Sequence, residues 1–463
     1  MSLRAFLAIC LCKLLRFFSR LLHRGGTAMP GEWANKLCPN LLSILSRGVK
    51  TVAITGTNGK TTTARMIEQA FSDRGESYFA NRSGANLLSG ITTEFVMNST
   101  LFGKCRKEYA VIECDEAAAV RVFPQLKPAV VVVTNLFRDQ LDRYGEVTHT
   151  LDNIRTALNS LPEPVTVCLN ADCSLTASLA LTASKEGRFH DYRFFGINKG
   201  AAPSGHKSEL SDASHCIRCK TEYEYDYITF GHLGGFRCSK CGYRREDPEY
   251  AVTDILAQRV DGSSIVLSVR GKQHLAEVNL PAMYNIYNAI AAIAAVTEMF
   301  GDVEAGIAAV ASFKCGFGRM EDFALGKGGA KVMLAKNPAG FNQVISFLRN
   351  IREKFILVLC LNDRPADGTD ISWIWDANFE ELCDLSATLA QVIVSGDRAS
   401  DMAVRVKYAG VDPRFVTIEH DYEKLVGELE GQDKPVYMIP TYTAMLELRE
   451  TLIRRCGGDE FWV

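Results

Sequence analysis

The chain has 463 residues, of which 47% are hydrophobic and 23% are charged, and its formal net charge is -2. This composition is that of an ordinary globular protein and excludes a disordered or fibrous chain. The length exceeds what one core usually serves, since domains commonly run about 100 to 150 residues, so we expect two or three domains. The nearly balanced charge argues against a protein that coats nucleic acid.

Cysteine usage points to a reducing compartment. The sequence has 15 cysteines, an odd number that cannot be fully paired, and no export signal precedes them. We therefore expect a cytoplasmic protein that uses some cysteines for metal. No apolar run reaches the roughly 18 residues that suggest a membrane span.

The N-terminal segment, residues 1–46, begins with a basic amphipathic pattern. Leucines and phenylalanines recur at helical spacing within residues 1–26, which contain no acidic residue but carry Arg4, Lys13, Arg16, Arg20 and Arg24. One interpretation is a helix, residues 1–24, that lies on an anionic membrane and holds the protein at the inner face of the plasma membrane. The other is a helix whose apolar face packs on the protein's own core.

From residue 49 onward, short β-branched runs alternate with helical patterns, which predicts an α/β fold with parallel sheets. A second unit of this kind begins at Lys331. Residues 201–249 interrupt the rhythm and are interpreted as an insertion. The predicted strands are 51–54, 109–112, 129–133, 165–169, 265–269, 332–335, 355–360, 391–395, 415–418 and 436–439, and a long helix is predicted over 284–300.

A phosphate-binding loop follows the first of these strands and leads into a helix over 63–71. Its residues are Gly56, Thr57, Asn58, Gly59, Lys60, Thr61 and Thr62. Backbone N–H groups at a helix N-terminus favour an anion, so we expect Lys60 to reach the phosphates of ATP and Thr61 to hold Mg²⁺. Ile54 stands where the usual pattern has its first glycine, which makes the loop a variant.

Polar residues follow two later strands. Glu113 ends the strand 109–112, and Asn135 and Asp139 follow the strand 129–133. Ligands of open α/β sheets bind beyond the carboxyl ends of the strands. We therefore expect Glu113 to share the magnesium with Thr61 and Asn135 to lie beside the nucleotide.

Four cysteines in the insertion have the spacing of a structural zinc site. Two C-x-x-C pairs, separated by 18 residues, are formed by Cys216, Cys219, Cys238 and Cys241. Four thiolates close a tetrahedral site and leave no open position, so we expect a zinc ribbon at about 205–250. A nucleic-acid-binding ribbon is an alternative, favoured by the neighbouring basic residues, but nearby acidic residues cancel their field.

Together these motifs resemble the Mur ligase superfamily. Residues 283–289, M-Y-N-I-Y-N-A, resemble the superfamily's segment near adenine, which implies that Asn285 and Asn288 bind nucleotide. Gly318 to Glu321 resembles its G-R-x-E joint, which implies that Arg319 reaches the phosphates. Tyr284 and Gln140 replace two histidines of the superfamily pattern.

The insertion and the segment 370–376, D-I-S-W-I-W-D, narrow the resemblance to the MurT family of that superfamily. The resemblance implies a P-loop ATP-binding domain over 47–320 and a Rossmann-like domain over 321–463. It also implies ATP-dependent amidation of the D-glutamate α-carboxylate of lipid II through an acyl phosphate, as a step of peptidoglycan synthesis. Ammonia would come from a GatD-like glutaminase subunit in a heterodimer.

A partner is also expected from the sequence itself, because no cysteine stands in the G-x-C-x-G context of a glutaminase nucleophile. The resemblance implies that Asp376 completes the partner's Cys-His pair across the interface. Alternating Trp373 and Trp375 predict an extended segment before it, and a helix-capping aspartate is the other interpretation. A ligase that joins amino acids without a glutaminase is the alternative function.

Overall fold

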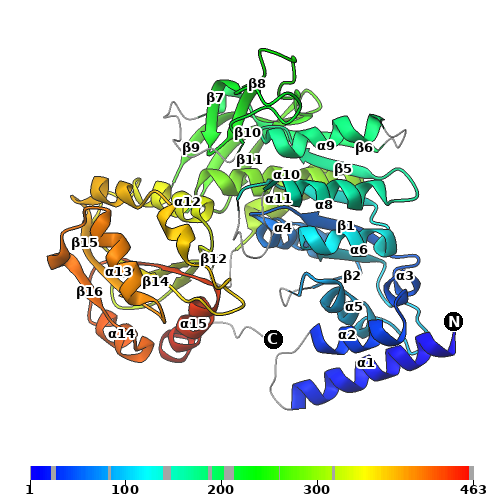
Figure 1. The fold of residues 1–463 in the computed structure, drawn as a ribbon, viewed down its shortest axis with the longest axis horizontal. Coiled ribbons are helices and arrows are strands. Elements are labelled where there is room, and N and C mark those ends of the chain that lie inside the picture. Colours follow the sequence, from blue (N-terminus) through cyan, green and yellow to red (C-terminus); the bar gives the residue numbers. More distant parts are fainter. Residues whose placement is uncertain are drawn as a thin grey trace.

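A computed structural model describes residues 2–21, 28–81, 85–138, 147–185, 190–202, 213–259, 261–314 and 319–457. Two large sheets lie side by side, the first built by the N-terminal part of the chain and the second by the C-terminal part (Figure 1). None of the helices in the described ranges combines the length and hydropathy that a membrane crossing requires.

The first sheet has nine strands and is parallel from β2 to β9, while β10 and β11 extend it as an antiparallel edge. Its inner strands are buried on both faces, as the burial of every residue of β4 illustrates. In sheet order the strands are β11 (Lys272–Val278), β10 (Ser263–Val269), β9 (Tyr250–Gln258), β6 (Asp191–Ile197), β5 (Thr166–Asn170), β4 (Val130–Val133), β1 (Lys50–Thr55), β3 (Tyr109–Glu113) and β2 (Tyr78–Ala80).

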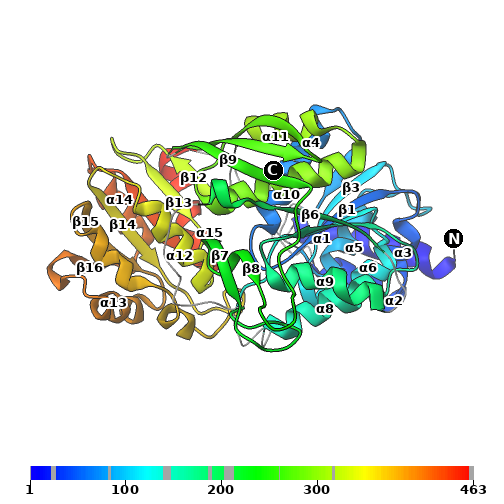
Figure 2. The same cartoon turned by 90° about the horizontal axis from the view of Figure 1, so that it is seen from above.

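Helices cover both faces of this sheet (Figure 2). One face carries α4 (Lys60–Asp73), α10 (Met283–Phe300) and α11 (Val303–Ser312), and the other carries α6 (Glu116–Leu126), α8 (Val147–Asn159) and α9 (Ser174–Lys185). The short η1 (Lys199–Ala201) follows β6. Crossover helices of this kind are what parallel neighbouring strands require.

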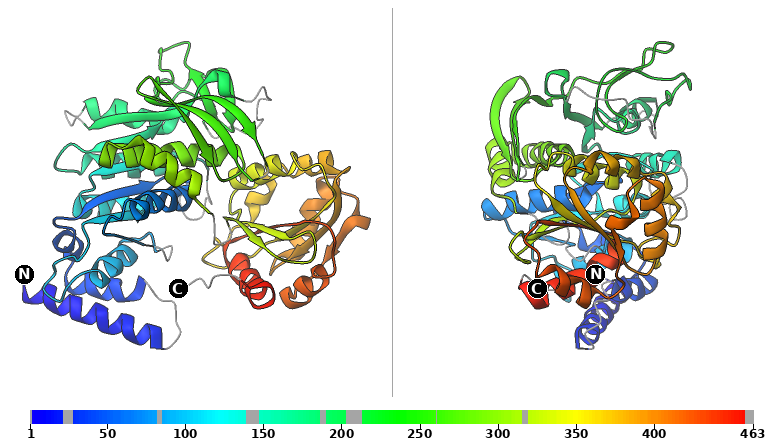
Figure 3. Two further views of the ribbon diagram at one scale, coloured as in Figure 1. Left: turned by 180° about the vertical axis from the view of Figure 1, so that it is seen from behind. Right: turned by 90° about the vertical axis from the view of Figure 1, so that its left-hand side faces the viewer.

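The N-terminal segment packs on the same core. Its helices α1 (Leu3–Leu21), α2 (Ala28–Leu37) and α3 (Leu41–Leu45) lie with α5 (Leu88–Met97) beyond the β2 end of the sheet (Figures 1 and 3). Ala5, Ala8, Ile9 and Cys12 are fully buried members of the main hydrophobic cluster. Core packing therefore uses one face of α1.

The second sheet has six strands, parallel except for β12. Along β14, Leu357 and Leu359 face one hydrophobic cluster while Ile356 and Val358 face another, so helices cover both of its sides. In sheet order the strands are β12 (Arg319–Phe323), β13 (Ala330–Met333), β17 (Val436–Pro440), β14 (Phe355–Cys360), β15 (Leu389–Ser395) and β16 (Val416–Ile418).

The helices of the second sheet divide between these two clusters. Those that contribute to the first cluster are α12 (Pro338–Leu348), η2 (Ser372–Trp375), η3 (Phe379–Leu385) and α13 (Ala399–Tyr408). Those that contribute to the second are α14 (Tyr422–Leu429) and α15 (Tyr442–Cys456). The short η4 (Pro413–Phe415) leads into the edge strand β16.

The predicted insertion is a separate small unit beside the first sheet. Its described part contains the hairpin β7 (Glu224–Phe230) and β8 (Leu233–Arg237), which forms a two-stranded sheet of its own. Regular α/β structure returns at Tyr250 with β9, earlier than the strand 265–269 with which it was expected to return. An aromatic cluster of Tyr223, Phe236 and Tyr243 forms its core together with cysteines.

Candidate functional site

The phosphate loop joins β1 to α4 in a conformation that needs both of its glycines. Gly56 has φ 120° and Gly59 has φ 85°. A Cβ on Gly56 would lie 2.4 Å from Thr134 Oγ1, and one on Gly59 would lie 2.0 Å from Asn288 Oδ1. Both approaches are far inside van der Waals contact, so the loop curls at the helix N-terminus only with glycine at these positions.

Lys60 is the first residue of α4, and its ammonium group lies inside the loop. Its Nζ donates hydrogen bonds to Gly56 O at 2.5 Å and to Glu116 Oε1 at 2.7 Å. Burial alone would lower the pKa of Lys60, but the charges of Glu116 and Glu113 outweigh it, and the pKa is raised. Lys60 is thus kept as a cation where phosphate oxygens would enter.

Thr61 and Glu113 are brought together as the sequence predicts. Thr61 Oγ1 donates to Glu113 Oε2 at 2.7 Å, beside the N-terminus of α4. Asn81 holds the backbone of Glu113, accepting from its N–H at 2.9 Å and donating to its carbonyl at 2.7 Å. A hydroxyl and a carboxylate are the hard oxygen ligands that Mg²⁺ prefers, so this pair fits the metal.

Asn135 holds the loop from the end of β4. Its Oδ1 accepts from the Asn58 N–H at 3.0 Å, and its Nδ2 donates to Asn58 O at 3.1 Å. Thr57 contributes in the same way, because its Oγ1 donates to Phe137 O at 3.2 Å and its N–H donates to Asn135 O at 2.9 Å. Asn135 therefore shapes the loop, and its amide also lines the adjoining pocket.

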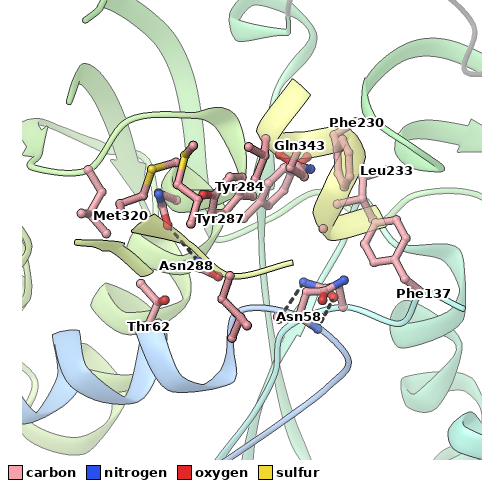
Figure 4. Close-up of a pocket in the computed structure, with 18 residues that line it drawn as sticks. Asn58, Thr62, Phe137, Phe230, Leu233, Tyr284, Tyr287, Asn288, Met320 and Gln343 are labelled. Atoms are coloured by element: carbon pink, nitrogen blue, oxygen red, sulfur yellow. Dashed lines mark hydrogen bonds between the residues drawn. The ribbon is translucent and has the colours of Figure 1, made fainter. Parts of the chain in front are cut away.

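A pocket opens beside the loop, lined by residues from both parts of the chain (Figure 4). Apolar and aromatic side chains dominate its walls, as is usual for a site that takes a flat organic ring. Asn285 and Asn288, both buried, lie on α10 at its floor, where Asn288 Nδ2 donates to Asn285 Oδ1 at 3.2 Å. Other lining residues are Asn58, Thr62, Phe137, Phe230, Leu233, Tyr284, Tyr287 and Met320.

The second sheet closes this pocket through α12. Asn337 caps α12 by accepting from the Gly340 N–H, and its Nδ2 donates to Asn58 Oδ1 at 3.2 Å in the phosphate loop. Gln343 lines the pocket, and its buried Nε2 has no hydrogen-bond partner among the described residues. A buried donor without a partner is costly, so this amide fits a ligand that brings an acceptor.

Three residues named in the sequence analysis lie partly or wholly outside the described part of the chain. Arg319 begins β12, but its side chain falls outside the described part of the chain. Asp139 and Gln140 lie outside the described residues altogether. The assignment of Arg319 to phosphate and of Asp139 to magnesium stays a prediction.

The four cysteines of the insertion converge. Their sulfur atoms all lie within 4.8 Å of one another, with Cys216 Sγ 3.5 Å from Cys241 Sγ and Cys219 Sγ 3.4 Å from Cys238 Sγ. Thiolates that share one tetrahedral zinc at about 2.3 Å lie about 3.8 Å apart, so the cluster fits this metal.

The two C-x-x-C turns have matching backbones. The N–H groups of Lys220 and Gly242 donate back to Cys216 O and Cys238 O, and both residues have positive φ, 61° and 72°. Glycine adopts this conformation without strain, whereas Lys220 carries a Cβ into it. The second turn therefore has the less strained sequence for the same shape.

The insertion is attached to the pocket side of the core by a buried carboxylate. Asp172 is fully buried, and its oxygens accept from Arg245 Nε, from Tyr287 Oη and from the Ile197 N–H, each within 2.8 Å. Arg245 follows the second C-x-x-C turn, and Tyr287 lines the pocket. The same network thus fixes the four-cysteine unit and one pocket wall.

The same contacts bear on the alternative that the insertion is a nucleic-acid-binding ribbon. Arg245 is occupied by Asp172, and Arg237 pairs with Glu224 at 2.8 Å. Two of the basic side chains on which that alternative depended are therefore balanced by acidic partners. The arrangement does not favour a nucleic-acid interface.

The expected extended segment before Asp376 is wrong. Ser372–Trp375 forms the 3₁₀ helix η2, with Trp373 buried and Trp375 52% exposed. A 3₁₀ turn has three residues rather than the two of a strand repeat, so the alternation of tryptophans did not reveal it. Asp376 is exposed, and no hydrogen bond or ion pair of its carboxylate occurs among the described residues; it does not cap a helix through its side chain.

Buried Arg405 holds the turn that carries Asp376. Its guanidinium donates to Ile374 O at 2.9 Å and to Ala377 O at 3.0 Å, and it pairs with Glu380 at 2.8 Å. Above it, the exposed Trp375 contacts Tyr408, which is 73% exposed, with ring centroids 5.8 Å apart. Asp376 is therefore presented rigidly beside an exposed aromatic pair.

The sequence did not single out several residues that build this site. Glu116, Asn81, Asp172 and Gln343 act through contacts between segments far apart in the chain, and none belongs to a motif of fixed spacing. An acidic residue after the strand 109–112 was the available signal for Glu116, but Glu113, Asp115 and Glu116 all follow that strand. The superfamily motif indicated Glu113 alone.

Comparison with known proteins agrees with this geometry. Residues 54–239 match the model of the Mur ligase middle domain, and residues 334–445 match that of the MurT ligase C-terminal region. The structure of MurF from Acinetobacter baumannii shares the fold, with a TM-score of 0.65 at 14% identity over 93% of this chain and 82% of that one. Fold and phosphate loop thus define a Mur ligase.

Two curated relatives show to which family of Mur ligases the chain belongs. The protein named lipid II isoglutaminyl synthase (glutamine-hydrolyzing) subunit MurT of Streptococcus pneumoniae is 33% identical over 98% of both chains. The protein of the same name from Staphylococcus aureus is 31% identical over 99% of this chain and 100% of its own length. The chain belongs to the MurT family.

Proposed function

We propose that this chain is the ligase subunit of a lipid II isoglutaminyl synthase. It would use ATP to convert the α-carboxylate of D-glutamate in the stem peptide of lipid II into the amide, a step of peptidoglycan synthesis. The observation that carries the proposal is the phosphate loop, with Lys60, Thr61 and Glu113 in place, beside a pocket in a MurT-family chain.

The chemistry requires activation because a carboxylate is a poor electrophile. A carboxylate oxygen attacks the γ-phosphorus of ATP, ADP leaves, and an acyl phosphate forms. The nitrogen of ammonia then attacks the acyl carbon, phosphate leaves, and a proton is lost to give the amide. Lys60 and the N–H groups at the start of α4 would stabilise the charge on the transferred phosphoryl group.

Two metals have places in this proposal. A magnesium ion at Thr61 and Glu113 supplies positive charge beside the phosphates. A zinc ion at Cys216, Cys219, Cys238 and Cys241 has a structural role, because four thiolates leave no position for a substrate. The convergence of the sulfur atoms within 4.8 Å supports a zinc ribbon in this insertion.

The proposed domain organisation has three parts. An ATP-binding domain spans 47–320, a Rossmann-like domain spans 321–463, and the segment 1–46 packs on the ATP-binding domain. The separate hydrophobic clusters of the two sheets support this organisation. Asn285, Asn288 and Asn135 would border the nucleotide from the first domain, and Arg319 would join them from the hinge between the domains.

Ammonia would come from a GatD-like glutaminase subunit. The exposed Trp375 and Tyr408 beside Asp376 support a protein docking site there, because exposed aromatic pairs are typical of interface centres. The Asp376 carboxylate would orient the histidine of a Cys-His pair in the partner. The complex would work in the cytoplasm at the membrane that carries the lipid-linked substrate.

The test is reconstitution of the complex. The chain is purified with its glutaminase and incubated with lipid II, ATP and glutamine, and the product is analysed by mass spectrometry for replacement of OH by NH₂. We expect amidated lipid II and ADP in equal amounts. A product extended by an amino acid, formed without the glutaminase, would instead establish the alternative amino-acid ligase.

A further inference from the structure

Helix α1 has an apolar face that the described residues of the protein leave exposed. Its small residues Ala5, Ala8 and Cys12 are buried against the core, but large apolar residues lie on the opposite side. Because they recur at helical spacing, these side chains form one continuous face. They are Leu3 (74% exposed), Leu7 (47%), Leu14 (54%), Phe17 (62%), Phe18 (48%) and Leu21 (65%).

The face lies at the outer edge of the molecule. Figures 1 and 3 show α1 outside α2 and α5, which separate it from the sheet. The turn after α5 extends the apolar surface, since Phe102, 77% exposed, contacts Phe6 with ring centroids 6.3 Å apart. Large leucine and phenylalanine patches are rarely left exposed unless they meet an apolar partner.

Every charge that α1 and the turn 99–107 carry is positive, although Glu94 of α5 lies close enough to Cys12 to add to the effect of burial in raising its pKa. Residues 2–21 and 99–107 contain no acidic residue but carry Arg4, Lys13, Arg16, Arg20, Lys104, Arg106 and Lys107. Partial burial and then the positive charge of Arg106 lower the pKa of Lys13, so the cations of the helix and the turn lie within each other's fields. The nearby Glu32 pairs with Lys36 at 2.8 Å and is neutralised.

We propose that this outer face of α1, with the turn at Leu101 and Phe102, binds the surface of an anionic lipid bilayer. Leucine and phenylalanine side chains would enter the boundary between headgroups and acyl chains while the basic residues contact lipid phosphates. Lys13 and Arg16 in the middle of α1 favour a helix lying on the membrane, because a spanning helix would bury them.

A lipid surface fits better than a second protein copy. In a two-fold dimer the same basic residues would face each other, with no acid on these two segments to compensate. Phospholipid headgroups supply negative charge and an apolar layer in one surface. The inference rests on the described α1 surface and does not depend on the proposed activity, although a lipid-linked substrate would give such binding a purpose.

The experiment compares matched leucine variants of the full chain in vesicle co-sedimentation. The test variant is Leu7→Gln/Leu14→Gln on α1. The control is Leu256→Gln/Leu275→Gln, which changes leucines of β9 and β11 that are 57% and 73% exposed. Vesicles contain phosphatidylcholine alone or with phosphatidylglycerol. Glutamine keeps the helix propensity of leucine, so α1 should remain folded.

We expect the wild type and the control to bind the phosphatidylglycerol vesicles, more weakly as salt is raised, and the test variant to bind roughly tenfold less. A second variant, Arg4→Gln/Lys104→Gln/Arg106→Gln, should lose the preference for phosphatidylglycerol and its salt dependence. Its residues are exposed and outside the core, so it tests the proposal even if the leucine variant unfolds.

Equal vesicle binding by the test variant and the wild type would overturn the proposal. So would a wild type that ignores vesicles but forms a dimer that Leu7→Gln/Leu14→Gln dissociates. Amidation of a soluble stem-peptide analogue is measured on the same proteins and should be unchanged. If the wild type with its glutaminase lacks that activity, the proposed function fails while the vesicle result stands.

Discussion

Lys60 shows how a loop residue recognised by its motif can also support the fold. In the sequence it is a surface lysine at the start of a helix, available to phosphate. In the structure its ammonium is buried and pairs with Glu116, with side-chain exposures of 11% and 6%. Its removal would leave a buried carboxylate without a cation, which is costly.

We therefore expect Lys60→Met to abolish amidation and also to lower the free energy of unfolding by about 3 kcal/mol, the usual cost of breaking a buried ion pair. In Lys60→Met/Glu116→Gln the uncompensated charge is gone, so stability should largely return while activity stays lost. Urea unfolding and the amidation assay separate the two effects. Amidation by the single variant at the wild-type rate would contradict the assignment of the phosphate loop.

Asp376 offers the opposite case, because its carboxylate supports nothing in this chain. Asp376→Asn should leave stability unchanged, since the side chain is exposed and has no partner among the described residues. If it orients a partner histidine, the variant complex should lose glutamine-dependent amidation and largely keep amidation driven by added ammonium. Equal loss of both activities would reject this role in favour of one at the ATP site.

At the scale of elements, the sequence predicts best where hydrophobic pattern alone decides the structure. Strand 355–360 and the helix at 284–300 are confirmed with almost the same bounds. The predicted strand 332–335 begins two residues too late, since the structure has this strand at Ala330–Met333. The prediction followed the apolar run and therefore left out Lys331, whose side chain is polar. Short η2 and η3 were not expected, since buried aromatic contacts rather than periodicity hold them.

The four-cysteine unit illustrates what spacing can and cannot reveal. The spacing predicted the cluster itself, and the sulfur atoms do converge. It could not predict that the hairpin β7–β8 supplies Phe230 and Leu233 to the pocket wall, because that depends on Asp172, 73 positions from Arg245. The unit therefore connects the four-cysteine cluster to the pocket proposed for ATP.

This connection leads to a prediction about zinc removal. Cys216→Ser should lose a single bound zinc, measured by elemental analysis, and should raise the KM for ATP severalfold because the hairpin is no longer held against the pocket. Cys456→Ser, at the end of α15 and outside the cluster, is the matched control and should keep both values. A zinc-free variant with unchanged KM would confine the metal to a role in stability or docking.

Across the whole molecule, the pocket belongs to neither sheet alone. Asn58 and Asn288 come from the first part of the chain, whereas Met333, Gln343 and Val344 come from the second. Sequence motifs located the phosphate loop but not this closure, because the contact between Asn337 and Asn58 joins residues 279 positions apart. A nucleotide bound there would hold the two parts together.

Gln343 tests this bridging role, because its buried Nε2 lacks a partner among the described residues and lies at the pocket, far from the phosphate loop in sequence. Gln343→Met keeps the length of the side chain and removes the donor. If the amide donates to bound nucleotide, the KM for ATP should rise about fivefold, the equivalent of about 1 kcal/mol for one hydrogen bond. A non-hydrolysable ATP analogue should raise the melting temperature of the variant less than that of the wild type.

Ser346→Ala, on the solvent side of the same helix, should match the wild type in both measurements. If Gln343→Met also matches it, the second sheet does not contact the nucleotide through this side chain.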